Sequence, residues 1–269
     1  HINFAPAIDI NNNPNNPVIS TRSFGDDKEQ VMRYGYMYAK ALQDNHILAS
    51  AKHFPGHGDT DADSHYSLPV IKKTLSELDS LELYPFRALI DSGVGSVMIA
   101  HLFIPSLDST VNRASSLSKN IVTDLLKKKL HFNGLIITDA LIMKGVSKFF
   151  PPGEIELEAL KAGVDILLMS ENVPRSFELI NEAIKNKTLD SNEIITRVKK
   201  ILMLKYWCGL NNYQPVQTEN LYQNLNTPEA EALNFELYKN AVTLLTNKEA
   251  IVPLKNVDLG TIASVVIND

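Results

Sequence analysis

Residues 52–69, KHFPGHGDTDADSHYSLP, concentrate histidines and carboxylates in one short segment. The segment contains three histidines, three aspartates and two glycines within eighteen residues. Such clusters are typical of metal binding, proton transfer or sugar recognition. The spacing of the individual residues distinguishes between these possibilities.

A zinc site would need His53 and His57 to face one ion. They are four residues apart, which suits a helix, but Pro55 and Gly56 lie between them and disfavour regular helix. The spacing therefore argues against zinc.

A calcium loop would need carboxylates at alternate positions, and Asp59, Asp61 and Asp63 have that spacing. Counted from Asp59, however, the sixth position is Ser64 rather than glycine, and the twelfth is Val70 rather than glutamate. We therefore predict no metal site in this segment.

Proton transfer fits the segment better. Asp63 and His65 are two residues apart, so an extended loop can pair a carboxylate with one imidazole nitrogen and leave the other to exchange a proton near neutral pH. Ser64 is a weak nucleophile candidate, because no G-x-S-x-G turn surrounds it. The alternative is a polar loop in which the histidines, His57 above all, only satisfy the backbone.

Asp139 is the better candidate for a nucleophile. It directly follows the apolar run of GLIITDALIM, so its carboxylate would emerge where a buried strand ends. An aspartate in that place could equally be a helix N-cap. Its combination with the Asp63–His65 pair and with the cations Lys52 and Arg22 favours the nucleophile.

Apolar strand candidates alternate with amphipathic helical patterns, which indicates an α/β fold with a parallel sheet. The expected strands end in polar residues such as Asp9, Lys52, His53, His101 and Asp139, as in a (β/α)8 TIM-like barrel whose active site lies at the carboxyl ends of the strands. A doubly wound sheet also places ligands there, but no nucleotide-binding glycine motif occurs. The expected strands are 2–8, 47–52, 96–100, 135–138 and 166–169, and the expected helices are 28–43, 75–90, 119–130, 154–162, 176–185 and 191–206.

Only five strands are expected where a barrel needs eight, so we predict a partial barrel that lacks its N-terminal βα units. The expected domains are a catalytic barrel over residues 1–212, a linker and helix over 213–240, and the start of a second α/β domain over 241–269. The first residues and the last residues both have strand-like patterns, and each pattern lies directly at the end of the sequence. We therefore expect that both ends were cut from a longer polypeptide and that a targeting signal is not visible.

The composition is that of a globular protein, with 44% hydrophobic and 21% charged residues. The net charge of −5 argues against a nucleic-acid partner, and no apolar run is long enough to span a bilayer. Cys208 is the single cysteine, so no internal disulfide is possible, and its apolar helical surroundings predict a core residue.

Four segments together resemble glycoside hydrolase family 3, in particular members of the bacterial β-N-acetylglucosaminidase type. The His/Asp motif of residues 52–65 is the most specific of them. The others are INFAPAIDINNNPNNPVISTRSFG (2–25), SVMIAHLFIPSLD (96–108) and GLIITDALIMKGV (134–146). The stretches ILMLKYWCGL and AVTLLTNKEAIVPLK resemble the exit of that family's barrel and its passage into a C-terminal α/β domain.

The resemblance implies a role for each matching residue. Asp139 matches the catalytic nucleophile, His65 the general acid/base and Asp63 its dyad partner. Further matches are to sugar-binding residues, namely Arg22, Lys52 and His53, and Met143 resembles a residue of the pocket wall, although a core methionine is an equally good interpretation. Asp9, His101 and Asp108 lie near the same face but receive no assigned contact.

The implied reaction is retaining hydrolysis of terminal β-linked N-acetylhexosamine from peptidoglycan fragments or chitooligosaccharides, with no metal or organic cofactor. Alternatives within the family are a β-glucosidase or β-xylosidase, or an N-acetylglucosaminide phosphorylase, because a neutral histidine base would repel phosphate less than a carboxylate. A different class, an inactive sugar-binding barrel, would keep its affinity in Asp139→Asn.

Two features depart from the family pattern. The family has a substrate-binding aspartate on a strand upstream of the segment that begins at Ile2, and Ala140 follows the nucleophile where an acidic residue is common. We expect Ala140 to alter the surroundings of Asp139 without abolishing its role. Because family members with a second domain are often exported, the resemblance also favours an extracytoplasmic location.

Overall fold

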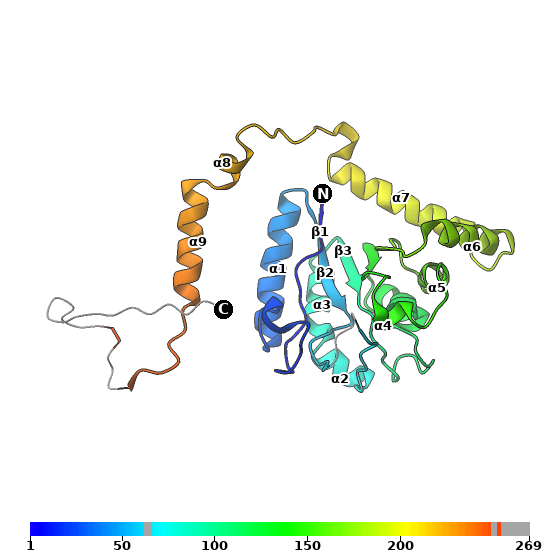
Figure 1. The fold of residues 1–269 in the computed structure, drawn as a ribbon, viewed down its shortest axis with the longest axis horizontal. Helices are drawn as coiled ribbons and strands as arrows, with labels where there is room; N and C mark the ends of the chain where they lie inside the picture. Colours follow the sequence, from blue (N-terminus) through cyan, green and yellow to red (C-terminus); the bar gives the residue numbers. More distant parts are fainter. Residues whose placement is uncertain (62–65, 249–251, 254–269) are drawn as a thin grey trace. The chain divides into compact units, whose positions relative to one another are not determined.

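Four parallel strands carry the residues of interest in this computed structural model, which describes residues 1–61, 66–248 and 252–253. The sheet has the order β1-β2-β3-β4, and it lies within a compact unit, His1–Tyr213. Figure 1 shows α1 beside β1 and β2, with α5 and α6 on the other side of the sheet. The strands are β1 (Ile2–Asn3), β2 (Leu48–Phe54), β3 (Ser96–Ile99) and β4 (Leu135–Thr138).

The interior strands are buried on both faces, as expected of a parallel sheet covered by helices. All residues of β3 and β4 are buried, and in β2 only Lys52 is partly exposed. The pairing of β3 with β4 is regular, from Ser96 opposite Leu135 to Ile99 opposite Thr138. The pairing of β2 with β3 shifts between Ala51 and Phe54, where β2 carries its polar residues. The Lys52–His53 and Phe54–Pro55 peptide bonds are cis.

Several helices begin at residues whose side chains cap them. Asp27 accepts a hydrogen bond from the N–H of Gln30 at the start of α1, and Thr74 forms a reciprocal capping box with Glu77 at the start of α2. The helices of this unit are α1 (Lys28–Asp44), α2 (Leu75–Ser80), α3 (Leu83–Asp91), α4 (Lys144–Ser147), α5 (Glu154–Ala162), α6 (Val173–Lys185) and α7 (Ser191–Trp207), with the short 3-10 turns η1 (Ser20–Arg22), η2 (Ser115–Leu117) and η4 (Leu210–Asn212).

The α1 helix approaches the sheet through small residues. It buries Val31, Gly35 and Ala39, and a Cβ at Gly35 would lie 2.6 Å from the side chain of Ile8. On α3, Phe86 packs edge-on against Phe54 of β2 with ring centroids 5.2 Å apart. These contacts bury the apolar faces of both helices, which also pack against each other and against β2.

The predicted α/β architecture with a parallel sheet is confirmed, but two expected strands are shorter. Residues 2–8 form β1 only over Ile2–Asn3, followed by a single bridge between Ala7 and Lys52. The expected strand 166–169 is reduced to one bridge between Ile137 and Ile166. The Leu168 N–H bonds to the Thr138 hydroxyl at 3.0 Å instead of to a backbone carbonyl, which interrupts the ladder.

The expected helix over residues 75–90 is two helices. Inside a continuous helix, the ring of Pro85 would collide with the carbonyl of Leu81, and Pro85 would donate no hydrogen bond to it. The chain breaks at Leu81, which has φ −126° and ψ −78°, so that Pro85 falls in the first turn of α3. The expected helix over 119–130 is present as a π-helix, η3 (Asn120–Lys129).

Residues Gln214–Asp269 form the second unit, described by itself. It contains α8 (Leu221–Leu225) and α9 (Pro228–Ala241), where Thr227 caps the first turn of α9. Residues 242–247, VTLLTN, form neither helix nor strand, and the expected strand in ASVVIND lies outside the described residues. Among the helices described in both units, none has the length and apolarity to cross a membrane.

Candidate active site

The candidate site forms at the carboxyl ends of β2 and β4, on either side of β3. Lys52 and His53 lie at the end of β2, and Asp139 is the residue that directly follows β4. The N–H of Asp139 donates to the carbonyl of Ile99 at 2.8 Å, which ties the turn after β4 to the end of β3. Two segments far apart in the sequence thereby bring a carboxylate, an ammonium group and an imidazole to one edge of the sheet.

The Asp139 carboxylate is kept ionised by its surroundings. Burial opposes the charge, but electrostatic interactions with His53, His101 and Lys52 and a hydrogen bond from the N–H of Ala140 outweigh it and lower the pKa of Asp139 below its usual value. The N–H of Ala140 lies 2.8 Å from Oδ1 of Asp139. An ionised, partly buried carboxylate is a nucleophile that needs no base to activate it.

Lys52 and Arg22 form the cationic side of the site. Burial lowers the pKa of Lys52, the charge of Arg22 lowers it further, and Asp139 and Asp9 partly oppose both effects. Arg22 is exposed at the end of η1, and its Nε donates to the carbonyl of Val18 at 2.8 Å. The guanidinium and the ammonium group are thus close enough to affect each other, and both can donate hydrogen bonds to hydroxyl groups.

His53 is held by Asp9, a contact that the sequence analysis did not assign. Asp9 is 1% exposed, and its Oδ2 lies 2.7 Å from Nδ1 of His53. The same carboxylate accepts the N–H of His53 at 3.1 Å and the N–H of His57 at 2.7 Å. Burial opposes its charge, yet His53 and His57 together lower the pKa of Asp9. The polar end of the first expected strand was the only sequence signal for this role.

His101 is a second residue to which the sequence analysis gave no contact. It is fully buried, with Nδ1 2.8 Å from the hydroxyl of Ser116 and Nε2 3.1 Å from the carbonyl of Ala140. Burial lowers the pKa of His101 and so favours the neutral ring. His101 therefore supports the carbonyl of Ala140, the residue that follows Asp139.

Met143 and Asp108 occupy different surroundings. Met143 is 7% exposed and lies in the turn after Asp139, where its N–H donates to the carbonyl of Ala140 at 3.0 Å. This position agrees with both interpretations, pocket wall and core. Asp108 accepts hydrogen bonds from the N–H of Thr110 in its own turn and from the hydroxyl of Ser118, ten residues further along the chain. These bonds satisfy Asp108 locally.

Asp63 and His65, the predicted dyad, lie outside the described residues, so their pairing stays a prediction. The residues that precede them are firmly held. Asn16 donates to the carbonyls of His57 and Gly58 at 2.8 and 3.0 Å, and a Cβ at Gly58 would lie 1.7 Å from the carbonyl oxygen of Ile10. The loop of asparagines and prolines at 11–17 thus supports the start of the His/Asp segment.

An ion network holds the other side of this turn. Lys73 binds Asp59 at 2.7 Å and also pairs with Glu82, which is 1% exposed. Burial acts against the charge of Lys73, but the two carboxylates raise its pKa. A Cβ at Gly56 would lie 2.7 Å from the Cβ of Glu82, so the turn packs directly over this network.

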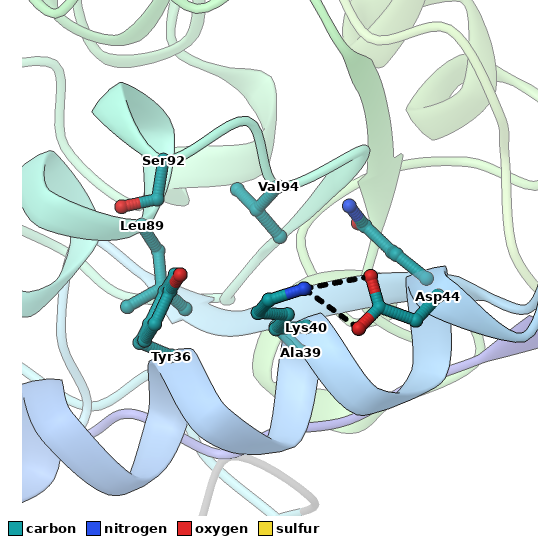
Figure 2. A pocket seen from close by; sticks show the side chains of 8 residues that line it. Tyr36, Ala39, Lys40, Asp44, Leu89, Ser92 and Val94 are labelled. Atoms are coloured by element: carbon teal, nitrogen blue, oxygen red, sulfur yellow. Dashed lines mark hydrogen bonds and ion pairs between the residues drawn. The ribbon is translucent and has the colours of Figure 1, made fainter.

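Within the described ranges, no group of three or more His, Cys, Asp or Glu side chains could hold a metal ion. A hollow of about 240 Å³ between α1 and α3 contains the Lys40–Asp44 ion pair (Figure 2), but none of the candidate site residues lines it. Cys208, expected in the core, is partly exposed and packs at the edge of a small cluster that includes Leu48.

Comparison with known proteins identifies the family. The model of the glycosyl hydrolase family 3 N-terminal domain matches residues 1–204. β-Hexosaminidase A of Pseudoalteromonas piscicida is 33% identical over 95% of this chain and 45% of its own length. The solved family 3 β-N-acetylglucosaminidase of Paenibacillus sp. str. FPU-7 superposes with a TM-score of 0.86 at 37% identity, over 91% of this chain and 47% of that one.

A third relative has a different activity. The solved β-glucoside phosphorylase BglX also superposes with a TM-score of 0.86, at 27% identity, over 94% of this chain and 48% of that one. The chain spans about half the length of these relatives. The domain that matches is a TIM-like (β/α)8 barrel, so the expected fold class is confirmed. The chain belongs to glycosyl hydrolase family 3.

Proposed function

We propose that the protein is a retaining exo-β-N-acetylglucosaminidase that removes terminal β-linked N-acetylhexosamine from peptidoglycan fragments or chitooligosaccharides. The observation that carries this proposal is the Asp139 carboxylate, which follows β4, has a lowered pKa and lies within the electrostatic reach of His53 and Lys52. The similarity to proteins named β-hexosaminidase and β-N-acetylglucosaminidase supports the choice of substrate.

In the proposed first step, the Asp139 carboxylate attacks the anomeric carbon while His65 protonates the departing oxygen. The bond to the leaving group breaks as the glycosyl–enzyme ester forms. In the second step, His65 removes a proton from water, the water oxygen attacks the same carbon, and Asp139 departs as a carboxylate. Asp63 fixes the tautomer of His65 and stabilises its cation. Both steps pass through an oxocarbenium-like transition state.

Lys52, His53 and Arg22 would bind and orient the sugar. Their donors can hydrogen-bond ring hydroxyls, and orientation of a bound substrate supplies part of the rate enhancement. The ammonium group of Lys52 also stabilises the charge of Asp139 between turnovers. Met143 would contribute an apolar wall to the pocket, beside the turn that carries Asp139.

A phosphorylase is the second candidate, favoured by the likeness to the β-glucoside phosphorylase BglX. A neutral histidine base would admit phosphate as the second-step acceptor more readily than a carboxylate base. The overall bonds exchanged are the same, with phosphate oxygen replacing water oxygen at the anomeric carbon. The product would be a glycosyl phosphate.

One experiment separates these functions. Release of p-nitrophenol is compared for the β-N-acetylglucosaminide and the β-glucoside, with and without phosphate, for the wild type and His65→Ala. Preference for the N-acetyl substrate, with loss of activity in His65→Ala, is the expected result. Phosphate stimulation would assign a phosphorylase, and glucosidase activity that survives His65→Ala would place the acid/base elsewhere.

We also propose the domain division and location implied by the resemblance. The catalytic barrel would occupy residues 1–212, a linker and helix 213–240, and the start of a C-terminal α/β domain 241–269. The division of the chain into compact units at Tyr213 and Gln214 supports the first boundary. An extracytoplasmic location would be tested by fractionating cells that express the full protein.

A further inference from the structure

The Asp9 carboxylate connects the segment that follows β1 to two histidines of the His/Asp segment. It is 1% exposed, and its acceptors face three donors: the N–H of His53, the ring of His53 and the N–H of His57. An ionised carboxylate only accepts hydrogen bonds, so the nitrogen of His53 that faces it, Nδ1, must carry a proton. In the neutral ring, the other nitrogen, Nε2, is then the unprotonated one.

We propose that Asp9 is a positioning residue for the sugar-binding histidine: by accepting Nδ1–H it fixes the ring orientation and tautomer of His53, and by accepting the N–H of His57 it fixes the start of the segment that contains the acid/base. This inference rests on the proposed function. It assigns to Asp9 a role in substrate recognition that neither the family match nor the sequence motif identifies.

The arrangement differs from an ordinary buried ion pair because one carboxylate serves two purposes. The contact at 2.7 Å to the ring of His53 determines which ring nitrogen carries the proton. The contact at 2.7 Å to the N–H of His57 holds the backbone of that residue in place. The same ring lies within electrostatic reach of the nucleophile, because its protonated form lowers the pKa of Asp139. Asp9 therefore contacts His53, and His53 in turn affects the pKa of Asp139.

Asp9→Asn is the informative substitution because it keeps the shape and removes the charge. If the amide oxygen continues to accept the His57 N–H, the amide nitrogen faces Nδ1 of His53 and donates to it. His53 can accept that bond only when Nδ1 is unprotonated, so the neutral ring must place its proton on Nε2. The substitution is thus expected to reverse the tautomer of His53. In other enzymes, loss of the carboxylate that orients a histidine is costly for the same reason.

The test measures tautomer and activity separately. The full protein is labelled with ¹⁵N-histidine, and the ring signals are recorded above pH 7.5, with His53 assigned by the loss of its signals in His53→Gln. We expect Nδ1–H in the wild type and Nε2–H in Asp9→Asn. We also expect kcat/KM for the p-nitrophenyl β-N-acetylglucosaminide to fall by about 10- to 100-fold.

Asp165→Asn is the matched control. Asp165 is also a buried aspartate, 7% exposed, which accepts a backbone N–H, that of Ile136 at 2.8 Å, and pairs with Lys200 at 2.8 Å. Asp165 directly precedes Ile166 and faces Ile136 near the start of β4, whereas Asp139 follows the end of that strand. Its substitution is expected to lower stability while leaving the tautomer of His53 and the kcat/KM value unchanged.

The outcomes are decisive even if Asp9→Asn does not fold. A wild-type His53 with an unprotonated Nδ1 overturns the proposal without any variant. An Asp9→Asn protein that keeps Nδ1–H, or that switches tautomer with unaltered kcat/KM, also overturns it. If the wild type does not hydrolyse the N-acetyl substrate at all, the proposed function fails, whereas the tautomer measurement still decides the Asp9–His53 contact.

Discussion

Asp139 is tied to Ile99 by a hydrogen bond of 2.8 Å from its backbone N–H to the strand carbonyl. The bond extends the pairing of β3 with β4 by one residue beyond Thr138, which lies opposite Ile99. The carboxylate is therefore carried by the sheet rather than by a free loop. A nucleophile placed on a rigid element keeps a defined distance to the sugar-binding residues of β2.

Asp139→Asn is expected to reduce kcat by about 1,000-fold or more, because an amide cannot form the glycosyl ester. Binding of the sugar in the ground state should change little, since the amide has nearly the same shape. Steady-state kinetics on the p-nitrophenyl β-N-acetylglucosaminide measures both values. Asp124→Asn, which removes an exposed carboxylate that pairs with Lys128, is the control and should retain wild-type kinetics. Substantial turnover by Asp139→Asn would exclude it as the nucleophile.

Lys52→Met tests the electrostatic part of the site. The ammonium group of Lys52 favours the ionised form of Asp139, so its removal should raise the pKa of that carboxyl. The acidic limb of the kcat/KM profile should then move to higher pH, in addition to any loss of sugar binding. Lys185→Met, at the exposed end of α6, should leave the limb in place. A limb that stays fixed or moves to lower pH in Lys52→Met would contradict this coupling.

His57 should make the free energy of unfolding depend on pH. Burial lowers the pKa of His57 from 6.5 to about 4, so between these values the unfolded chain binds more protons than the folded one. The neutral ring contributes at most about 3 kcal/mol to the free energy of unfolding. This contribution is fully present above pH 6.5 and is lost as the pH falls toward 4. Urea unfolding at several pH values should give a flatter dependence for His57→Gln than for the wild type. His131→Gln, at an exposed site, should keep the wild-type slope; equal slopes in all three proteins would refute the assignment.

Gly58→Ala tests how closely the first loop supports the His/Asp segment. A Cβ at Gly58 would lie 1.7 Å from the carbonyl oxygen of Ile10, so the backbone must move apart. We expect a loss of about 3 kcal/mol in the free energy of unfolding, together with a lower kcat/KM. Gly93→Ala is the control: its φ is +84° but nothing lies within 4 Å of the new Cβ, and it should cost about 1 kcal/mol. Equal costs for the two substitutions would show that the approach to Ile10 is not restrictive.

The sequence predicts well what depends on local pattern. Lys52, His53 and Asp139 end apolar runs, and the parallel sheet brings those ends to one edge, as expected. The break at Leu81 was missed, because one helix was expected over 75–90, although Pro85 is a local signal against the middle of a helix. The bridge that replaces the expected strand at 166–169 has no comparable local signal, since the Thr138 hydroxyl that takes its place belongs to another segment.

Contacts between distant segments could not be predicted in the same way. Asp9 and His53 are 44 positions apart, and Asn16 reaches Gly58 across 42. Composition indicates that such residues are polar, but only the fold decides which donor each acceptor meets. His101 is a similar case, because its partner, the carbonyl of Ala140, is a backbone group that no side-chain motif reveals.

The most direct test of the account is to identify the residue that carries the sugar during turnover. The full protein is incubated with a 5-fluoro derivative of N-acetylglucosaminyl fluoride, whose glycosyl–enzyme breaks down slowly, and its peptides are analysed by mass spectrometry. One glycosylated peptide, modified at Asp139, is expected, together with release of product with retained anomeric configuration in normal turnover. Label on another residue, or product with inverted configuration, would contradict it.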